Sequence, residues 1–547
     1  MKKIQLLLLM LFVIVVHAQK PSMKMYSHVP PEEAKKKKNF YSTLLMANDK
    51  EVLISDKTKK GSVITVYNAA TMKKTSSFTL DIPEINGKNV DWVNRLIHSD
   101  KITSIYSHYN KKEDENTIYG KITDRKNKTI VKQKVLFQSS AKKRRKIGGM
   151  EVYYSPDNSK ILILRVPITK RYENEKMEMV MYDQELNKLF EKELNFPYKN
   201  KSLGIQQILL TNNGDVSIIA FWEPSKEEIN AEPDLKDQMT FKLFKVTENN
   251  DELEEIEIAE KGYALSTCQG VISNDTLNEI VYFGFYRDIK KGTKKRNQYG
   301  VNGVYYIKLD TDKWSINTMK FNVVDEKTII KIFMGNATTE QAEKRAKKAA
   351  SKGRGISSMK IKGIYYEMDG SIKIISQIEY VVEVCTTNPK TGQTTCSYHY
   401  HNNQIIVFSL NNSGDLENTG IVPKQQLLVN HSTFNGHIPL LYNDKIFFVY
   451  NDHDFNYNTK KLSKKNRNNY SFTFSGRKKS RLTCATMDAK GKVTKQPMVD
   501  SWKQNILVHP FEFIQINNSS IITWGKIRKS KELVLLKIGF DGKVYIK

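Results

Sequence analysis

The sequence predicts an all-β protein assembled from eight tandem units. The first observation is a polar turn that leads into a strand-like run, as in "YSPDNSKILILRV" at 154–166. Asn, Asp and Gly tolerate turn dihedrals and bond their own backbone, so each such turn marks a hairpin. The second observation is that another hairpin follows the first, with a left arm such as "MEMVMYD" at 177–183. Each unit is therefore expected to hold four antiparallel strands.

The same order of turns and strands returns along the whole chain. Each turn precedes a β-branched and aromatic run of strand length. The eight turns lie at 47–50, 98–101, 155–158, 211–214, 273–275, 368–371, 442–445 and 517–520. The expected units span 40–80, 90–137, 148–196, 203–258, 262–323, 358–423, 432–499 and 506–547.

Four-stranded antiparallel units in tandem are typical of a β-propeller, in which radial stacking leaves only short sheet edges. We therefore expect an eight-bladed β-propeller of four-stranded antiparallel blades. A seven-bladed ring is the alternative if the first and last units share one blade by strand exchange. Both units contain four candidate strands, the last of them "KVYIK" at 543–547, which favours closure by packing alone. A pair of unrelated β-sandwiches would also give regularly spaced strands, but the repetition over eight units favours the propeller.

Three stretches carry a family resemblance. "YSPDNSKILIL" at 154–164 resembles the strand motif of WD40-like and TolB-type propeller repeats. "VYFGFYRD" with "GVYYIKLD" (281–288 and 303–310), together with "LLYNDKIFFVYNDHDFNYN" at 440–458, resembles a group of large secreted bacterial propeller-like proteins of unknown function. The likeness covers most of the chain, but its motifs are structural. It implies the fold and export, and it implies no catalytic residue.

The first 18 residues are typical of a secretory signal peptide. Two lysines precede an apolar run at 4–16, and small or apolar residues stand at the cleavage positions before Gln19. A membrane anchor is the alternative, but a bilayer span needs about 20 apolar residues. No Cys follows the cleavage site to carry a lipid, and no later stretch is apolar enough to form a transmembrane segment. We expect a protein exported to the periplasm, the cell surface or the medium.

The rest of the chain is expected to divide simply. A basic N-terminal segment, 19–39, precedes a single propeller domain, 40–547. An insertion at 325–357 separates blades five and six and contains the one short basic helix that we expect. Thr338 fits the N-cap of that helix and Gly353 fits its end.

The net charge of +28 predicts attraction to anionic polymers or surfaces. In a propeller, turns between strands one and two, and three and four, lie on one face, and the other connections lie opposite. The basic runs at 142–146, 287–296 and 451–481 all belong to the second class, whereas the connection 223–237 is acidic. The candidate anion-binding residues are Lys142, Lys143, Arg144, Arg145, Lys294, Lys295, Arg296, Arg477, Lys478 and Lys479.

The sixth unit contains an unusually long hairpin, "IEYVVEVCTTNPKTGQTTCSYHYHNN". If residues 389–392 form a four-residue loop, Cys385 and Cys396 face each other across the two strands. Opposed positions have Cα separations that suit a disulfide, and an oxidising compartment favours its formation. We expect this disulfide to staple a protruding arm. Cys268 and Cys484 are expected to be buried thiols.

Two small groups of residues suggest metal binding weakly. His399 and His401 share one side of a strand, but no carboxylate accompanies them, so structural or surface histidines are the simpler interpretation. Asp452, Asp454 and Asn456 place oxygen ligands at alternate positions, as the start of a calcium loop does. The Gly and the bidentate Glu that complete such a loop are missing. Calcium is the one cofactor to consider, and otherwise we expect none.

No spacing identifies a nucleophile, a base or a phosphate loop, so the catalytic residues are unknown. Asp91 with Arg95, and His431 with His437, are pairs that could serve chemistry near the axis. The first hypothesis is a non-catalytic binding or scaffold protein that engages an anionic polysaccharide or surface. A propeller hydrolase or lyase acting on an acidic polymer, and a protein–protein scaffold of the envelope, are the alternatives. Sequence-specific nucleic-acid binding is not expected, because no reading module accompanies the charge.

Overall fold

We describe the protein from a computed structural model. The structure describes residues 21–28, 42–58, 61–81, 84–85, 88–98, 100–235, 240–250, 252–274, 279–288, 300–335, 340–351, 355–453, 456, 472, 480–499, 506–527 and 533–540. The signal peptide that we expect at 1–18 lies outside these residues.

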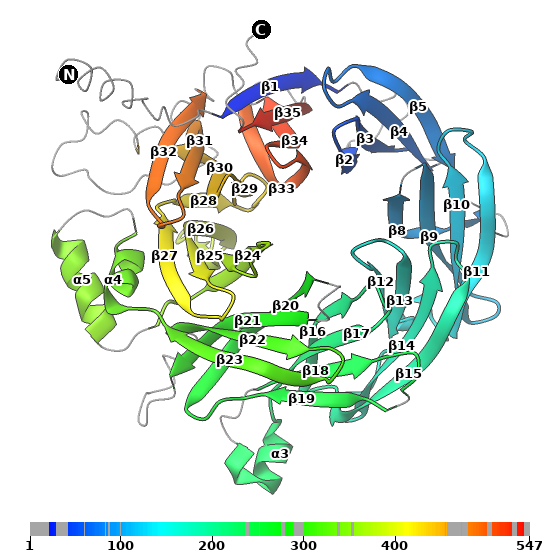
Figure 1. Ribbon diagram of the computed structural model, residues 1–547, viewed down its shortest axis with the longest axis horizontal. Helices are drawn as coiled ribbons and strands as arrows, with labels where there is room; N and C mark the ends of the chain where they lie inside the picture. Colours follow the sequence, from blue (N-terminus) through cyan, green and yellow to red (C-terminus); the bar gives the residue numbers. More distant parts are fainter. Residues whose placement is uncertain are drawn as a thin grey trace, which may run out of the picture.

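The strands form eight antiparallel sheets that follow one another around a ring, so the predicted eight-bladed propeller is confirmed (Figure 1). Blades 1 and 2 consist of β2 (Ser42–Ala47), β3 (Glu51–Lys57), β4 (Gly61–Asn68), β5 (Lys74–Asp81), β8 (Asp91–His98), β9 (Lys101–Asn110), β10 (Glu115–Asp124) and β11 (Ile130–Ser140). A two-stranded sheet of β6 (Glu84–Ile85) and β7 (Lys88–Asn89) lies in the connection between them.

The next three blades repeat this order. They consist of β12 (Gly149–Tyr154), β13 (Lys160–Val166), β14 (Asn174–Asp183), β15 (Lys188–Lys199), β16 (Leu203–Leu210), β17 (Val216–Trp222), β18 (Thr240–Val246), β19 (Glu254–Ile258), β20 (Tyr263–Asn274), β21 (Glu279–Asp288), β22 (Gly303–Asp310) and β23 (Ser315–Val323).

Blades 6 and 7 carry the longest additions. They consist of β24 (Met359–Tyr366), β25 (Ile372–Thr387), β26 (Thr394–Leu410), β27 (Leu416–Val422), β29 (Ile438–Tyr442), β30 (Lys445–His453), β31 (Ser480–Met487) and β32 (Val493–Val499). An extra strand, β28 (Gln426–Val429), pairs with β26 beyond the end of β27.

The ring closes by strand exchange. Blade 8 contains β33 (Ile506–Asn517), β34 (Ser520–Ile527) and β35 (Leu533–Gly539), and its fourth strand is β1 (Ser22–Ser27) from the N-terminal segment. Closure by packing alone was therefore wrong, because β1 pairs with β35 and leaves no edge for a fourth strand after it. The exchange does not reduce the ring to seven blades, since blade 1 has four strands of its own. The strand that we expected at 543–547 lies outside the described residues.

One apolar cluster fills each junction between neighbouring blades, including the junction of blades 8 and 1. The residues come from both faces of each sheet, because the Ile- and Val-rich middle strands are covered on both sides. In β13, for example, five consecutive residues from Ile161 to Arg165 are buried. Continuous apolar runs, rather than strict alternation, are what such doubly covered strands require.

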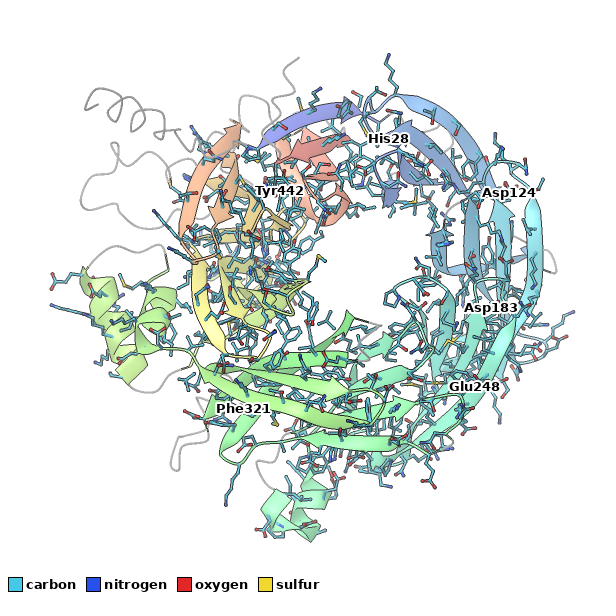
Figure 2. The ribbon with its side chains drawn as sticks, in the orientation of Figure 1. His28, Asp124, Asp183, Glu248, Phe321 and Tyr442 are labelled. Atoms are coloured by element: carbon cyan, nitrogen blue, oxygen red, sulfur yellow. A yellow bond between two sulfur atoms is a disulfide. The ribbon has the colours of Figure 1, made fainter. Side chains whose placement is uncertain are left out.

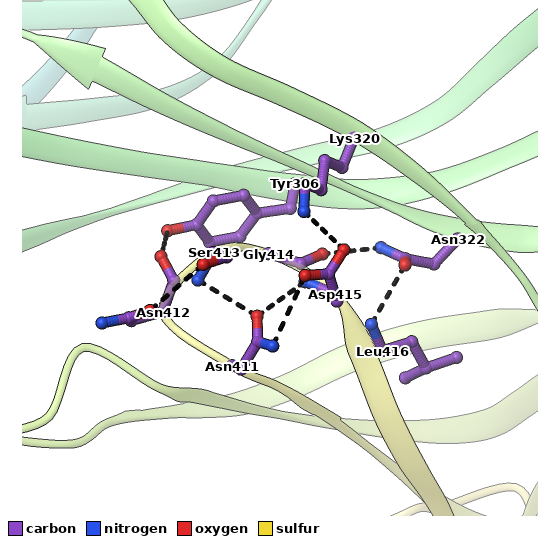
Figure 3. Close-up of polar contacts among 9 residues, drawn as sticks. All are labelled: Tyr306, Lys320, Asn322, Asn411, Asn412, Ser413, Gly414, Asp415 and Leu416. Atoms are coloured by element: carbon purple, nitrogen blue, oxygen red, sulfur yellow. Dashed lines mark hydrogen bonds and ion pairs between the residues drawn. The ribbon is translucent and has the colours of Figure 1, made fainter.

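Turns of one blade also bond to the outer strand of the previous blade (Figure 3). The Asn322 side chain of β23 donates to the carbonyl oxygen of Gly414 at 2.8 Å and accepts from the backbone N–H of Leu416 at 3.0 Å. Lys320 forms an ion pair with Asp415. Gly414 has φ +81°, and a Cβ there would lie 2.2 Å from the ring of Tyr306. Both the dihedral and the close packing therefore require glycine in this predicted type of turn.

The described residues include three α-helices instead of the one that we expected. These are α3 (Lys226–Ala231), α4 (Glu326–Met334) and α5 (Glu340–Ser351). The insertion thus holds two helices, since Asp325 caps α4 through a bond from the backbone N–H of Thr328. Thr338 and Gly353 lie outside the described residues. None of the helices in the described part of the chain has the length and apolar composition of a membrane span.

The two faces of the disc differ in the length of their loops. Turns within each hairpin, between strands one and two or three and four, are short throughout. Every long excursion lies between strands two and three or between blades, including α3, the α4–α5 insertion and β28. Because adjacent strands are antiparallel, these connections share one face of the disc. We call it the insertion face, and the opposite one the short-turn face.

Candidate functional site

The best defined basic group on the insertion face is the run 142–146 between blades 2 and 3. It forms a turn of 3₁₀-helix, η1 (Arg144–Lys146), and all five side chains are exposed. Arg144 forms an ion pair with Asp91 of β8. Among the described residues, the other four cations of the run, Lys142, Lys143, Arg145 and Lys146, have no ion pair. We call this run the basic cluster.

Asp91 and Arg95, which the sequence suggests as a pair near the axis, each contact a different residue. The Asp91 carboxylate bonds Arg144, and an Arg95 guanidinium nitrogen lies 3.3 Å from the Ser55 hydroxyl oxygen. Burial lowers the pKa of Arg95 to about 10. The two side chains have different surroundings because Trp92 and Asn94 flank an irregularity in the pairing of β8 with β9.

The remaining candidate anion-binding residues, Lys294, Lys295, Arg296, Arg477, Lys478 and Lys479, lie outside the described residues. Helix α5 is described, and two of its lysines pair within the helix. Lys344 bonds Glu340, and Lys347 bonds Glu343, each at 2.8 Å. These i, i+4 pairs offset part of the positive charge of the insertion.

The acidic connection 223–237 also takes part in ion pairing. Ser225 and Glu228 form a capping box at the start of α3. Glu227 pairs with Lys201, which arises from the connection between blades 3 and 4. One basic side chain of this sector, Lys201, is therefore paired with an acid, whereas four of the five cations of the basic cluster have no ion pair among the described residues.

The arm of blade 6 has the predicted register. Cys385 lies opposite Cys396 with a Cα–Cα distance of 4.0 Å, and the two form the expected disulfide. The Asn388 N–H donates to the Gln393 carbonyl at 2.9 Å, which confirms the four-residue loop. Cys268 and Cys484 are buried free thiols, as expected.

The arm exposes large apolar and aromatic side chains. They are Tyr380, Val381, Val382, Val384 and Tyr398. Tyr398 of β26 is 48% exposed. Near the base of the arm, β26 pairs with β25 on one edge and with β28 on the other. On its other edge β25 pairs with β24 only as far as Ile378, and within the described residues no strand pairs with that edge beyond this point.

The two arm histidines make local contacts. His401 stacks on Tyr380 with ring centroids 4.5 Å apart, and a His399 ring nitrogen lies 3.1 Å from the Ser397 hydroxyl. Burial, and then the proximity of His399, lowers the pKa of His401. Glu383 lies close to both cysteine sulfurs, but these sulfurs are bonded to each other and cannot ligate a metal.

The residues predicted for calcium lie partly outside the described chain, since Asp454 is not included. Asp452 is fully buried, with one oxygen 3.2 Å from the Lys495 ammonium and the other 2.7 Å from the Asn456 amide nitrogen. The same carboxylate accepts the backbone N–H of His453 at 2.8 Å. Hydrogen bonds from these protein groups therefore occupy both oxygens of Asp452, and calcium stays an untested prediction.

The sequence analysis did not identify a buried polar network between blades 6 and 7. Its centre is Lys424, 1% exposed, whose ammonium donates to the Gln426 side-chain oxygen at 2.8 Å and to the Asn402 carbonyl at 3.2 Å. Gln426 in turn donates to the carbonyl of Asn451 at 2.8 Å. Burial lowers the pKa of Lys424 well below its ordinary value, although the charge of Asp452 opposes this shift.

His437 belongs to the same junction. A ring nitrogen of His437 lies 2.8 Å from the Gln377 side-chain oxygen, and the ring packs edge-on against Phe448. Burial, and then the charge of Lys424, lowers its pKa well below the ordinary value. His431 packs against Phe434 instead, so the structure gives the two predicted partners separate surroundings. The sequence does contain a sign of this network, because Gln377 and Asn451 are polar residues within otherwise apolar strand runs.

A second buried group lies at the junction of blades 8 and 1 (Figure 2). His28 follows β1 directly, and its ring nitrogens lie 3.0 Å from an Asp56 oxygen and 2.7 Å from the Tyr67 hydroxyl. Ser42 donates to the same Asp56 oxygen at 2.6 Å. Burial, and then the charge of Asp56, raises the pKa of Tyr67 to about 12.

This group contains Ser, His and Asp but does not form a catalytic triad. A triad needs the serine hydroxyl to bond the histidine, which the aspartate then orients. Here both Ser42 and His28 bond the aspartate, and all three side chains are buried. The arrangement fixes the segment after β1 onto blade 1.

Comparison with known proteins finds only distant structural likenesses. No family model and no curated protein matches the sequence. The β-propeller domain of the Trilobed protease from Pyrococcus furiosus is 11% identical, with a TM-score of 0.32 over 84% of this chain and 98% of that one. The WD40 domain of SCAP from fission yeast is 6% identical, with a TM-score of 0.33 over 92% and 99%.

The polysaccharide lyase Uly1 is 9% identical, with a TM-score of 0.33 over 84% of this chain and 94% of that chain. At such TM-scores no activity or partner can be transferred to this chain. The similar structures include a β-propeller domain and a WD40 domain.

Proposed function

We propose that this chain is an exported, non-catalytic binding protein whose insertion face engages an anionic polysaccharide or an anionic surface. The observation that carries the proposal is the basic cluster, in which Lys142, Lys143, Arg145 and Lys146 are exposed and have no ion pair among the described residues. Such clustered charge attracts anionic polymers over several ångströms. This attraction weakens steeply as the salt concentration rises.

The arm supports the same proposal from the other side of the ring. Strands β25 and β26 lie across the central opening from β11 and β12, between which the basic cluster lies (Figure 1). The arm exposes two aromatic rings, Tyr380 and Tyr398. Aromatic rings combine a large apolar face with a polar tip and so suit the apolar faces of sugars. A long acidic glycan could thus contact cations at one side of the opening and aromatic rings at the other.

The experiment is binding to immobilised polygalacturonate, with neutral dextran as the reference polymer. The test variant replaces Lys142, Lys143, Arg145 and Lys146 by Gln and keeps the Arg144–Asp91 pair. A control variant replaces four exposed lysines of the short-turn face, Lys50, Lys73, Lys126 and Lys490, and so removes the same charge. We expect the test variant to bind about ten-fold more weakly at low salt and the control to bind like the parent. Equal losses of affinity in both variants would show that the basic cluster is not a specific binding site.

A protein partner is a second candidate, favoured by one observation. The edge of β25 beyond Ile378 carries exposed Val381, Val382 and Val384, and an open edge of this kind can accept an added strand. Deletion of 383–398 removes Val384 and the outer part of this edge, so it should weaken capture of such a partner without lowering the melting temperature of the ring. The variant Cys385→Ser with Cys396→Ser keeps all three valines and should retain the partner. Undiminished capture by the deletion variant would exclude the outer part of the arm.

A further inference from the structure

The arm of blade 6 has one edge whose backbone groups point away from its own hairpin. On β26, the Tyr398 carbonyl oxygen accepts from the Asn430 N–H at 2.8 Å, and the Tyr398 N–H donates to the Asn430 side-chain oxygen at 2.9 Å. Tyr398 therefore directs its backbone groups away from β25. In an antiparallel pair, opposed residues either bond each other or both point outward, so Glu383, which lies opposite Tyr398, points outward from β25. Every second residue from Val381 to Thr387 does the same, because the register of the arm is unbroken.

Within the part of the chain that the structure describes, no strand pairs with this edge. β24 pairs with β25 only as far as Ile378, and the Glu379 N–H donates to the carbonyl oxygen of Ser358 at 2.8 Å. All residues from 381 to 387 are exposed. We call this stretch of β25, 381–387, the free edge. Exposed backbone groups along a strand edge favour pairing with a strand of another chain.

The charge of the arm favours a second copy of this chain as the partner of the free edge. The whole chain carries a net charge of +28, so two copies repel each other over most of their surface. Between 380 and 398, by contrast, Glu383 and Lys390 are the charged residues, and their charges cancel. Two copies therefore approach each other with the least repulsion through their arms. An antiparallel strand edge also pairs readily with a copy of itself about a two-fold axis, since both copies then use the same surface.

We propose that two copies of this protein join through their free edges in a two-fold symmetric, antiparallel strand pair. The full length of the free edge is used only when Val384, its midpoint, lies opposite Val384 of the second copy. In this register Glu383 lies opposite Cys385 of the second copy, so the two glutamates do not face each other.

The proposed register also brings apolar side chains together. Val382 and Val384 are 41% and 39% exposed, and they lie on the same side of β25, because side chains alternate along a strand. In the dimer these valines of both copies form one apolar strip across the two-fold axis. The inference names the partner in the second candidate function and rests on that candidate, whereas the basic cluster takes no part in it.

Sedimentation equilibrium of the full chain tests the proposal. A pair of short strand edges buries less surface than a stable interface, so we expect a reversible dimer at about 10–100 μM protein. The association should strengthen from low salt to about 0.5 M potassium chloride, because salt screens the repulsion between the two basic rings. Binding of polygalacturonate should weaken over the same range of salt, so the two interactions are distinguishable.

Proline substitutions distinguish the two edges of the arm. Glu383→Pro removes an outward N–H from the free edge and none of the bonds between β25 and β26, so it should weaken the dimer about ten-fold or more. Thr394→Pro is the matched control, because it places proline at an outward, exposed position of β26, and it should dimerise like the parent. Loss of the dimer in Thr394→Pro would indicate head-to-tail pairing of β25 with β26 and would overturn the two-fold arrangement.

A charge swap tests the register. In Val384→Lys, and likewise in Val384→Glu, like charges face each other across the axis, so each variant alone should sediment as a monomer. An equimolar mixture of the two variants should dimerise again, and this recovery excludes misfolding as the cause of the loss. Polygalacturonate binding should be unchanged in all of these variants. A parent chain that stays monomeric in both salts at its highest soluble concentration, or a mixture that stays monomeric, would overturn the proposal and leave the anionic-polymer proposal standing.

Discussion

The junction of blades 8 and 1 differs from the junction of blades 6 and 7 in the polar groups that it buries. Both have an apolar cluster between their sheets. At the first, one carboxylate, Asp56, receives bonds from His28 and Ser42. At the second, the ammonium of Lys424 donates to the side-chain oxygen of Gln426 and to the backbone carbonyl of Asn402. In each case the buried groups come with a segment that crosses the junction, either the chain after β1 or the link that contains β28.

The comparison shows what a crossing segment needs in order to stay in place. A segment that lies across two sheets brings backbone groups into the interior, and these must find partners. Asn451 meets this need at the second junction, since its amide bonds the carbonyls of Phe434 and Val508 at 3.0 and 2.9 Å. Polar side chains in these interiors therefore hold chain segments in place, and none of them needs a catalytic role.

The largest expected effect is at the first junction. Asp56→Ala removes the acceptor of both His28 and Ser42, which are buried, and leaves their donors unsatisfied. We expect a loss of about 2–5 kcal/mol in the free energy of unfolding. Urea unfolding followed by tryptophan fluorescence measures it. Asp100→Ala, at an exposed carboxylate, should change this free energy by less than about 0.5 kcal/mol. Equal stability of the two variants would contradict the role of Asp56.

A smaller effect is expected at the second junction, and it depends on pH. Folding lowers the pKa of Lys424 well below its ordinary value. At a pH between these two pKa values, Lys424 is protonated in the unfolded chain and neutral in the folded chain. The free energy of unfolding should therefore rise with pH up to about 10.5, by at most about 1.4 kcal/mol per pH unit for this group. Lys424→Met should lack this rise as the pH approaches 10.5, and Lys492→Met should keep it. If the free energy of unfolding changed with pH in the same way in the parent and in Lys424→Met, the burial effect assigned to Lys424 would be refuted.

The smallest effect concerns His437. Its pKa in the folded state lies well below 6.5, so acidification below pH 6.5 protonates the unfolded chain first and destabilises the fold. We expect this residue to cost about 1 kcal/mol between pH 6.5 and 5.5. His437→Leu should lose less stability than the parent over this range, and His98→Gln should lose as much as the parent. If His437→Leu and the parent lost the same stability on acidification, the His437 imidazole would not be the group that destabilises the fold.

The sequence predicted those features that depend on local pattern. The eight turns gave the blade count, and one four-residue loop gave the disulfide, because hairpin register follows from the turn. Features that depend on distant parts of the chain were missed. No local pattern links β1 with β35, or His28 with Asp56, since only the closed ring brings them together. Lys424 resembled any surface lysine, because its burial depends on β28 packing beside blade 7.

Closure by β1 has a consequence for how the protein forms. The strand that completes blade 8 is made first, but its partner β35 is made more than 500 residues later. At the usual synthesis rate of about 5–20 residues per second, the N-terminal strand waits roughly 25–100 s for its partner. During that time blades 1 to 7 can form one after another while the circle stays open.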